Sequence, residues 1–246
     1  MQPSTKKANF SVFAPYFDSC GQQSLAELYF SKAEKALSGK EIRILADIGC
    51  GTGVAAQHFA EKGITVFAVD ASAAMLHEAQ TRRAKNTITY IHETLPNITL
   101  AQEADAVLCL GDTLNYVPPV ELGSAIKNLC DNVNHEGFLL LDYTRTESYE
   151  QLDAFQTGEE REMQVEGKRV VMKCGYSRQN KIATITVSIY PDNVHEVHQQ
   201  FAHADVTLSK LLRDNGFKIV AREYYNPFDS QDPRGFKTFI VAKKST

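Results

Sequence analysis

The stretch Asp47-Ile-Gly49-Cys-Gly51-Thr-Gly53 decides the expected fold of this chain. It follows a short apolar run, and its three glycines at alternate positions open a turn that leads from a strand into a helix. Glycine allows backbone angles that other residues avoid, and the free N–H groups at a helix start attract an anionic group. The stretch therefore predicts a ligand-binding turn after the first strand of an α/β sheet.

Short apolar runs alternate with helical patterns over the first 143 residues. A helix is expected from Gln22 to Ser38, and Ser72 is placed to cap another helix after the second run. This alternation predicts a doubly wound, Rossmann-like α/β fold with a mostly parallel sheet of seven strands. The expected strands are Ile42 to Ala46, Thr65 to Val69, Thr87 to Ile91, Ala106 to Leu110 and Phe138 to Leu141, followed by a closing hairpin of Phe217 to Tyr225 and Phe236 to Ala242.

The hydrophobic period changes to two from Glu147 onward. Turns are expected at Glu166-Gly167, near Gln179-Asn180 and at Pro191-Asp192-Asn193. Residues 147–203 are therefore expected to form an antiparallel β-meander, an inserted cap over the active-site crevice. The whole chain, 1–246, is expected to be a single domain in which residues 1–40 form an N-terminal lid and helix.

Composition and charge exclude several kinds of partner. The chain has 246 residues and a formal charge of −4, without a basic block that could neutralise a run of phosphates, so nucleic acid is disfavoured. Apolar runs are too short to span a membrane. Five scattered cysteines, an odd number, are typical of free thiols in a reducing compartment. We expect a cytoplasmic monomer or homodimer.

Asp70 ends the second apolar run and lies 21 residues beyond Gly49. In an open α/β sheet this position faces the same crevice as the glycine turn and can accept both hydroxyls of a ribose. A dinucleotide-binding turn has Gly or Ala at its sixth position, but counting from Gly49 that position is Val54. The sequence thus favours another ribose cofactor, with a nicotinamide-dependent oxidoreductase as an alternative.

The motif of Asp47, Gly49, Gly51 and Gly53, with Asp70 after the next strand, resembles the first motif of class I S-adenosylmethionine-dependent methyltransferases. The resemblance covers most of the chain, most strongly residues 42–76. It implies S-adenosyl-L-methionine as the cofactor, with Asp47 beside its methionine end, Ala71 and Met75 against adenine, and Glu93 and Thr94 near the adenine amine. The cofactor contacts implied are Asp47, Gly49, Gly51, Gly53, Asp70, Ala71, Met75, Glu93, Thr94 and Leu110.

Other segments resemble the branch of this family that methylates small molecules. Asp112 to Tyr116 is similar to its Asp-x-Leu-Asn-Tyr segment, and the Asn-Pro-Pro-Tyr motif of nucleobase-methylating enzymes is absent. Phe17-Asp18 is similar to the Tyr-Asp of the family's N-terminal lid. Glu196-x-His198-x-Gln200 resembles a strand of such enzymes; its three polar residues share one face, which either lines the pocket or meets solvent.

The implied reaction moves a methyl group to a nitrogen or oxygen of a small-molecule acceptor. Asp112, Tyr143 and His198 are the candidates for orienting that acceptor or taking its proton. His195 and His198 would face opposite sides of a strand, so no metal site is expected. A non-catalytic S-adenosylmethionine-binding protein remains a second alternative.

Overall fold

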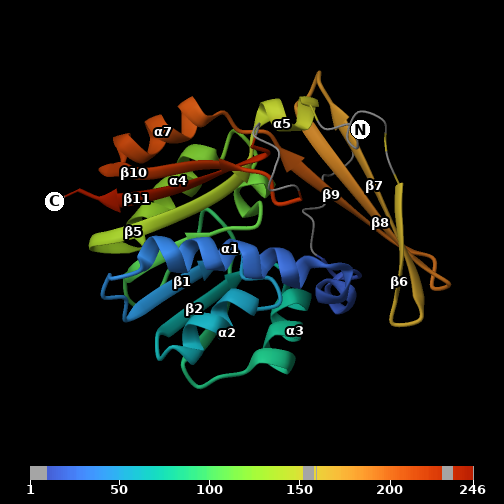
Figure 1. Ribbon diagram of the computed structural model, residues 1–246, viewed down its shortest axis with the longest axis horizontal. Coiled ribbons are helices and arrows are strands. Elements are labelled where there is room, and N and C mark those ends of the chain that lie inside the picture. The colour runs from blue at the N-terminus through green and yellow to red at the C-terminus, as the bar shows by residue number, and fades with distance from the viewer. Residues whose placement is uncertain (1–9, 152–157, 159, 229–234, 246) are drawn as a thin grey trace.

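A seven-stranded sheet with helices on both faces forms the body of the protein (Figure 1). The computed structural model describes residues 10–151, 158, 160–228 and 235–245. The strand order is β10-β11-β5-β4-β1-β2-β3, with β1 to β5 parallel and β11 antiparallel to both neighbours. The strands are β1 (Ile44–Ile48), β2 (Thr65–Asp70), β3 (Ile88–His92), β4 (Ala104–Cys109), β5 (Val133–Thr144), β10 (Phe217–Tyr225) and β11 (Lys237–Lys244). The expected fold class is confirmed.

Alternating side chains of the central strands build two cores, one on each face of the sheet. In β2, Val66 and Ala68 join the cluster under α1, α2 and α3, whereas Phe67 and Val69 join the cluster under α4 and α7. Successive residues of a strand point to opposite faces, which accounts for apolar runs without polar alternation. The helices are α1 (Gln22–Leu37), α2 (Val54–Glu61), α3 (Ala73–Arg83), α4 (Leu122–Asp131), α5 (Thr146–Gln151) and α7 (Asp205–Asp214).

A separate four-stranded antiparallel sheet stands beside the carboxyl ends of the parallel strands (Figure 1). It is a meander of β6 (Glu160–Val165), β7 (Lys168–Ser177), β8 (Ile182–Tyr190) and β9 (Val194–Phe201). All three expected turns fall between its strands as predicted. Glu166 and Gly167, both with positive φ, join β6 to β7, Gln179-Asn180 lies between β7 and β8, and Pro191 to Asn193 joins β8 to β9. The expectation of a period-two pattern from Glu147 was wrong at its start, because α5 occupies this segment and buries Ser148 and Tyr149.

The N-terminal segment crosses from the glycine turn to the meander. It contains the 3-10 helices η1 (Ala14–Tyr16) and η2 (Asp18–Cys20). Asp18, whose side chain is 7% exposed, receives a 2.7 Å hydrogen bond from Arg83 at the end of α3 and a 2.6 Å bond from the hydroxyl of Thr52. At the other end, the N–H groups of Val12 and Phe13 donate to the Glu196 carboxylate of β9. The expected lid begins at residue 1, and residues 1–9 lie outside the described part.

Replacing Asp18 by alanine should destabilise the protein and release the N-terminal segment. Removing one partner of a buried ion pair leaves the other charge uncompensated, so Asp18→Ala should cost about 3–5 kcal/mol. Urea denaturation measures this cost, and limited proteolysis before Gln22 reports the release. Asp131→Ala is the control, because its pair with Lys127 is exposed and should contribute less than about 1 kcal/mol. Equal losses in the two variants would contradict the anchoring role of Asp18.

Candidate active site

A pocket of about 320 Å³ lies at the carboxyl ends of the parallel strands. The chain there passes from β1 to β2 and β3 on one side and later to β4 and β5 on the other, and such a reversal point is where open α/β sheets bind ligands. The N-terminal segment and β9 contribute to its wall. The lining residues are Phe10, Phe17, Ile48, Gly49, Gly51, Val69, Asp70, Ala71, Ser72, Met75, Glu93, Thr94, Leu95, Ile98, Gly111, Thr113, Tyr116, Val117, Pro118, Glu121, Gln199 and Phe201.

The glycine turn is fixed by backbone hydrogen bonds to β2. The N–H groups of Gly49 and Cys50 both donate to the carbonyl of Val69, at 2.8 and 3.0 Å. Gly49 has φ +77°, and a Cβ there would lie 2.1 Å from the Thr113 hydroxyl oxygen, so the turn presses against the loop after β4. A side chain at this position is excluded both by the backbone angle and by the contact.

The Asp70 carboxylate connects the glycine turn to the start of α3. One carboxylate oxygen accepts the N–H of Gly51 and the other accepts the N–H of Ser72, both at 2.8 Å. Ser72 in turn caps α3, as expected, by accepting the N–H of Met75 at 3.2 Å. Burial raises the pKa of Asp70, and these backbone donors oppose the rise.

Asp47 lies behind the turn and is 4% exposed. One of its carboxylate oxygens has no hydrogen-bond partner among the described residues. Burial, with the nearby charge of Asp70, raises the pKa of Asp47 to about 7, whereas the N–H of Ala56 opposes the rise. An unpartnered buried carboxylate beside a helix start is suited to meet the ammonium group of a ligand.

Seven of the residues assigned to cofactor binding line this one pocket, namely Gly49, Gly51, Asp70, Ala71, Met75, Glu93 and Thr94. Glu93 also accepts the N–H of Thr99 at 2.8 Å, which fixes its carboxylate against the following loop. The other three are set back from the wall. Asp47 lies beneath the turn, Gly53 packs against Ala79 of α3, and the carbonyl of Leu110 accepts the hydroxyl of Thr113.

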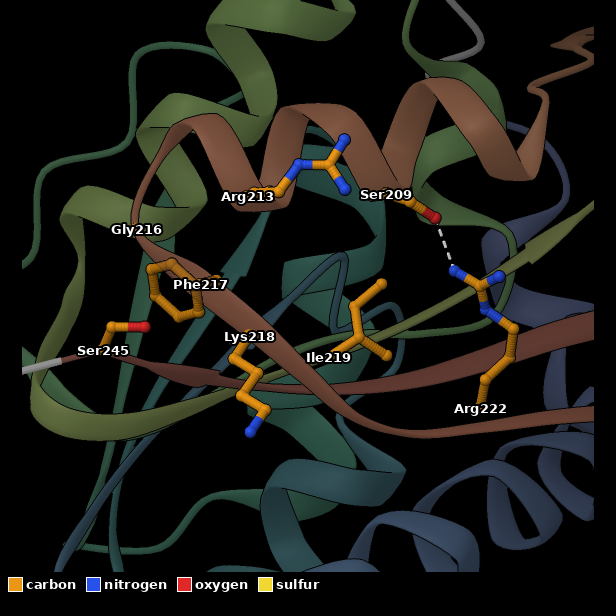
Figure 2. A pocket seen from close by; sticks show the side chains of 8 residues that line it. All are labelled: Ser209, Arg213, Gly216, Phe217, Lys218, Ile219, Arg222 and Ser245. Carbon is orange, nitrogen blue, oxygen red and sulfur yellow. Dashed lines mark hydrogen bonds between the residues drawn. The ribbon is translucent and has the colours of Figure 1, made fainter.

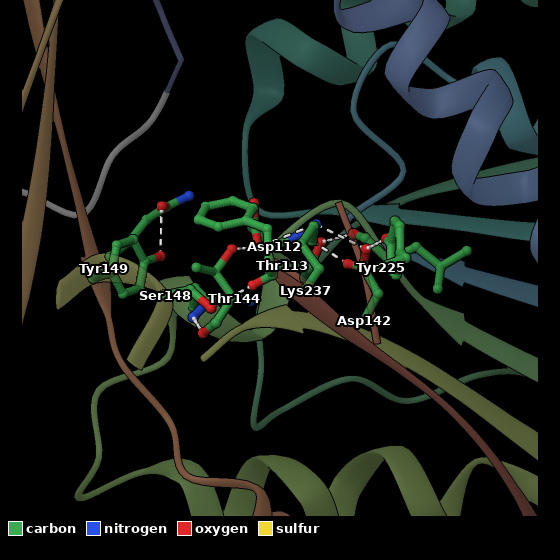
Figure 3. Close-up of polar contacts among 12 residues, drawn as sticks. Asp112, Thr113, Asp142, Thr144, Ser148, Tyr149, Tyr225 and Lys237 are labelled. Atoms are coloured by element: carbon green, nitrogen blue, oxygen red, sulfur yellow. Dashed lines mark hydrogen bonds and ion pairs between the residues drawn. The ribbon is translucent and has the colours of Figure 1, made fainter. Parts of the chain in front are cut away.

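A buried charge network adjoins the pocket at Asp112 (Figure 3). Lys237, 1% exposed, lies 2.8 Å from Asp142 and 3.2 Å from Asp112, and the Tyr225 hydroxyl donates to Asp142. Asp112 itself has φ +63° and accepts the hydroxyl of Thr144 at 2.8 Å. Burial alone would lower the pKa of Lys237, but the carboxylates of Asp112 and Asp142 outweigh it and raise the pKa.

The three residues assigned to the acceptor lie in different surroundings. Asp112 is flanked in the chain by two lining residues, Gly111 and Thr113. His198 packs behind the lining, with its ring 4.3 Å from that of Phe10 and 6.2 Å from that of Tyr116. The structure does not bring Tyr143 to the pocket, because this fully buried residue donates its hydroxyl to Asp205 at the start of α7.

Sequence reasoning did not assign Phe10, Thr113 or Lys237 to the site. Lys237 stands at the start of an otherwise apolar run, which was a signal that its ammonium group has a buried partner. Thr113 follows the Asp112 that had been assigned, and only the fold shows that it meets Gly49. For Phe10 the local sequence gives no comparable signal.

A second hollow lies on the outside, between α7 and β10 (Figure 2). Arg213, Lys218 and Arg222 surround it, and Arg222 donates to the hydroxyl of Ser209. The hollow includes the beginning of β10, which pairs with the end of β11. The end of β11 in turn pairs with the first half of β5. The hollow therefore lies at the amino ends of the parallel strands, away from the crevice at their carboxyl ends where open α/β sheets bind ligands.

Residues 45–137 match the sequence model of a family described as "Methyltransferase domain". These residues form a methyltransferase domain. The match covers the glycine turn, Asp70 and the loop after β4, which form most of the pocket wall. The chain therefore carries a methyltransferase domain, and this match supports S-adenosylmethionine-dependent methyl transfer as its activity.

Three similar proteins match this chain over nearly its whole length. A putative methyltransferase from Geobacillus is 24% identical, over 96% of this chain and 99% of the relative. The structure of an S-adenosylmethionine-dependent methyltransferase from Clostridium acetobutylicum superposes with a TM-score of 0.73 at 16% identity, covering 95% of this chain and 98% of the other. A sugar N-methyltransferase from Streptoalloteichus reaches 0.72 at 19% identity, covering 96% and 93%.

The pocket contains residue types that S-adenosylmethionine requires. The Asp70 carboxylate is a possible acceptor for ribose hydroxyls, and the apolar side chains of Met75, Leu95 and Ile98 line the same pocket. The unpartnered oxygen of Asp47 lies beneath the turn, outside this lining.

Gly49→Ala should damage both stability and cofactor binding. Backbone strain of about 1–2 kcal/mol adds to about 1–3 kcal/mol of overpacking against Thr113. Gly39→Ala is the control, because Gly39 has a similar φ of +74° but nothing within 4 Å of its added Cβ. Chemical denaturation and titration calorimetry with S-adenosylmethionine should show a strain cost alone for Gly39→Ala. Unchanged cofactor affinity in Gly49→Ala would contradict the role of the turn.

The protein without cofactor should lose stability as the pH rises from about 4 to 7. Asp47 has its pKa raised from 3.8 to about 7, so in this range the folded state binds more protons than the unfolded state. One pKa unit corresponds to about 1.4 kcal/mol, which sets an upper limit of about 4 kcal/mol on the loss. The difference in unfolding free energy between wild type and Asp47→Asn, measured across this range, isolates the contribution. A difference that does not change with pH would show that Asp47 is ionised throughout.

Proposed function

We propose that this methyltransferase transfers the methyl group of S-adenosylmethionine to a nitrogen or oxygen of a small-molecule metabolite. The observation that carries the proposal is one pocket in which the glycine turn, Asp70 and Met75 share a wall with Tyr116 and residues of β9. A concave site of about 320 Å³ suits a small acceptor rather than a macromolecule. A sugar N-methyltransferase among the structural neighbours supports the same class of acceptor.

In this proposal the chain's own residues bind and orient. Asp70 accepts the ribose hydroxyls, Asp47 faces the methionine ammonium, and Met75 packs against the base. Bound S-adenosylmethionine supplies a methyl carbon that its positive sulfur already activates, so alignment of the acceptor and exclusion of water remain for the protein. The N-terminal segment and β9 provide the cover, because both contribute to the wall of the pocket.

We propose the cytoplasm as the site of action, since the five cysteines are free thiols. Among the described residues, no helix combines the length and the apolar character that crossing a membrane requires. The other residues assigned from the sequence, Glu93, Thr94 and Asp112, remain proposals for contacts to the cofactor and acceptor.

Asp70→Ala should weaken S-adenosylmethionine binding about 100-fold, because the ribose loses a charged acceptor and the turn loses its bond at Gly51. Titration calorimetry measures the affinity. Asp105→Ala is a matched control, because this carboxylate also accepts two backbone N–H groups, those of Arg43 and Ile44, but at the amino end of β1. The control should lose stability and keep its affinity. Equal affinity in Asp70→Ala and wild type would refute the ribose assignment.

A further inference from the structure

The part of the pocket around Tyr116 is aromatic, and the pocket as a whole is acidic. Phe10 and Tyr116 line it, and the ring of His198 packs against both of theirs. Of the described residues that line the whole pocket, three are acidic, Asp70, Glu93 and Glu121, and none is lysine or arginine. Anionic ligands therefore find no cation in this wall.

Polar atoms without partners lie directly behind these rings. His198 is 2% exposed, and neither of its ring nitrogens has a hydrogen-bond partner among the described residues. Glu196 is 7% exposed; one carboxylate oxygen accepts the N–H groups of Val12 and Phe13, and the other is likewise unpartnered. That free oxygen and the Nε2 of His198 are 4.0 Å apart, too far for a hydrogen bond. A donor placed beside the pair can bond to both.

The charges around this part of the pocket are also unbalanced. Burial raises the pKa of the Tyr116 hydroxyl, and the carboxylates of Asp112, Glu196 and Asp70 raise it further. The negative charge of all three carboxylates is therefore felt at the Tyr116 hydroxyl. The ammonium group of Lys237 is shared between Asp112 and Asp142 (Figure 3), which leaves one ammonium for two carboxylates. A cationic group is the ligand that this arrangement favours.

We propose that the methyl acceptor is an amine without an anionic group, which binds beside Tyr116 with an N–H donated to Glu196 and its proton passed to His198. This inference rests on the proposed function and narrows its acceptor from nitrogen or oxygen to nitrogen. The bound ammonium group first gives one proton to an imidazole nitrogen of His198, which frees the nitrogen lone pair. That lone pair forms the new N–C bond, and the S–C bond breaks with its electron pair left on sulfur. S-adenosylhomocysteine and the N-methylated amine are the products.

The environment of His198 fits the role of proton acceptor. Burial lowers its pKa, and the neighbouring Glu196 charge opposes this shift without cancelling it, so the ring is neutral at physiological pH. A neutral ring has a lone pair for the proton. The carboxylate beside it stabilises the imidazolium that forms.

The test compares three probes of similar shape in protein saturated with S-adenosylhomocysteine: benzylamine, benzyl alcohol and benzoate. Histidine Hε1 resonances in NMR spectra report binding, and His198→Asn identifies the signal of His198. We expect benzylamine to shift this signal with a dissociation constant at least 10-fold lower than that of benzyl alcohol, and benzoate to leave it in place. Benzoate binding as tightly as benzylamine, or no probe shifting the signal, would overturn the proposal.

Glu196→Gln tests the carboxylate with little risk to the fold, because glutamine keeps one oxygen for the N–H groups of Val12 and Phe13. It should remove the preference for benzylamine over benzyl alcohol. Glu162→Gln is the matched control in the same four-stranded sheet, where an exposed Glu162 pairs with Arg169, and it should keep the preference. A preference retained in Glu196→Gln contradicts the inference.

A thermal melt with S-adenosylhomocysteine alone distinguishes a failure of the proposed function from a failure of the inference about the acceptor. If the wild type is not stabilised by this product, the proposed function itself fails. If it is stabilised but shows no amine preference, only the inference about the acceptor fails.

Discussion

The approach of the glycine turn to the loop after β4 is the contact on which the rest of the site depends. Gly49 meets Thr113 so closely that no side chain fits between them, and the carbonyl of Val69 holds the turn from the side of β2. The turn after β1 thus bonds to the backbone of β2 and packs directly against the Thr113 side chain in the loop after β4. This contact between the glycine turn and the loop after β4 fixes the ends of β2 and β4. Asp70 lies at the first of these ends and Asp112 follows the second.

Local sequence patterns were sufficient for the central sheet and for the cofactor half of the pocket. Apolar runs gave the strands because both faces of the sheet are buried, and the glycine turn with Asp70 lies within 24 residues of chain. The helix α1 was predicted to within one residue at its end, and Ser72 was recognised as a cap. These features depend on neighbours in the chain.

The acceptor half depends on contacts between distant segments, and sequence alone could not supply them. Lys237 meets Asp142 across 95 positions, and Phe13 meets Glu196 across 183. The period of two in β9 places Glu196, His198 and Gln200 on one face, but it cannot tell a buried face from a solvated one. The structure shows that this face is buried, under the N-terminal segment and α5, where Tyr149 donates to Gln200.

The N-terminal segment is attached at both of its described ends, to α3 and the glycine turn through Asp18 and to β9 through Glu196. One short stretch of chain therefore spans the cofactor half and the acceptor half. Because the same segment contacts both halves, thermodynamic linkage requires any effect of one ligand on the affinity of the other to be reciprocal.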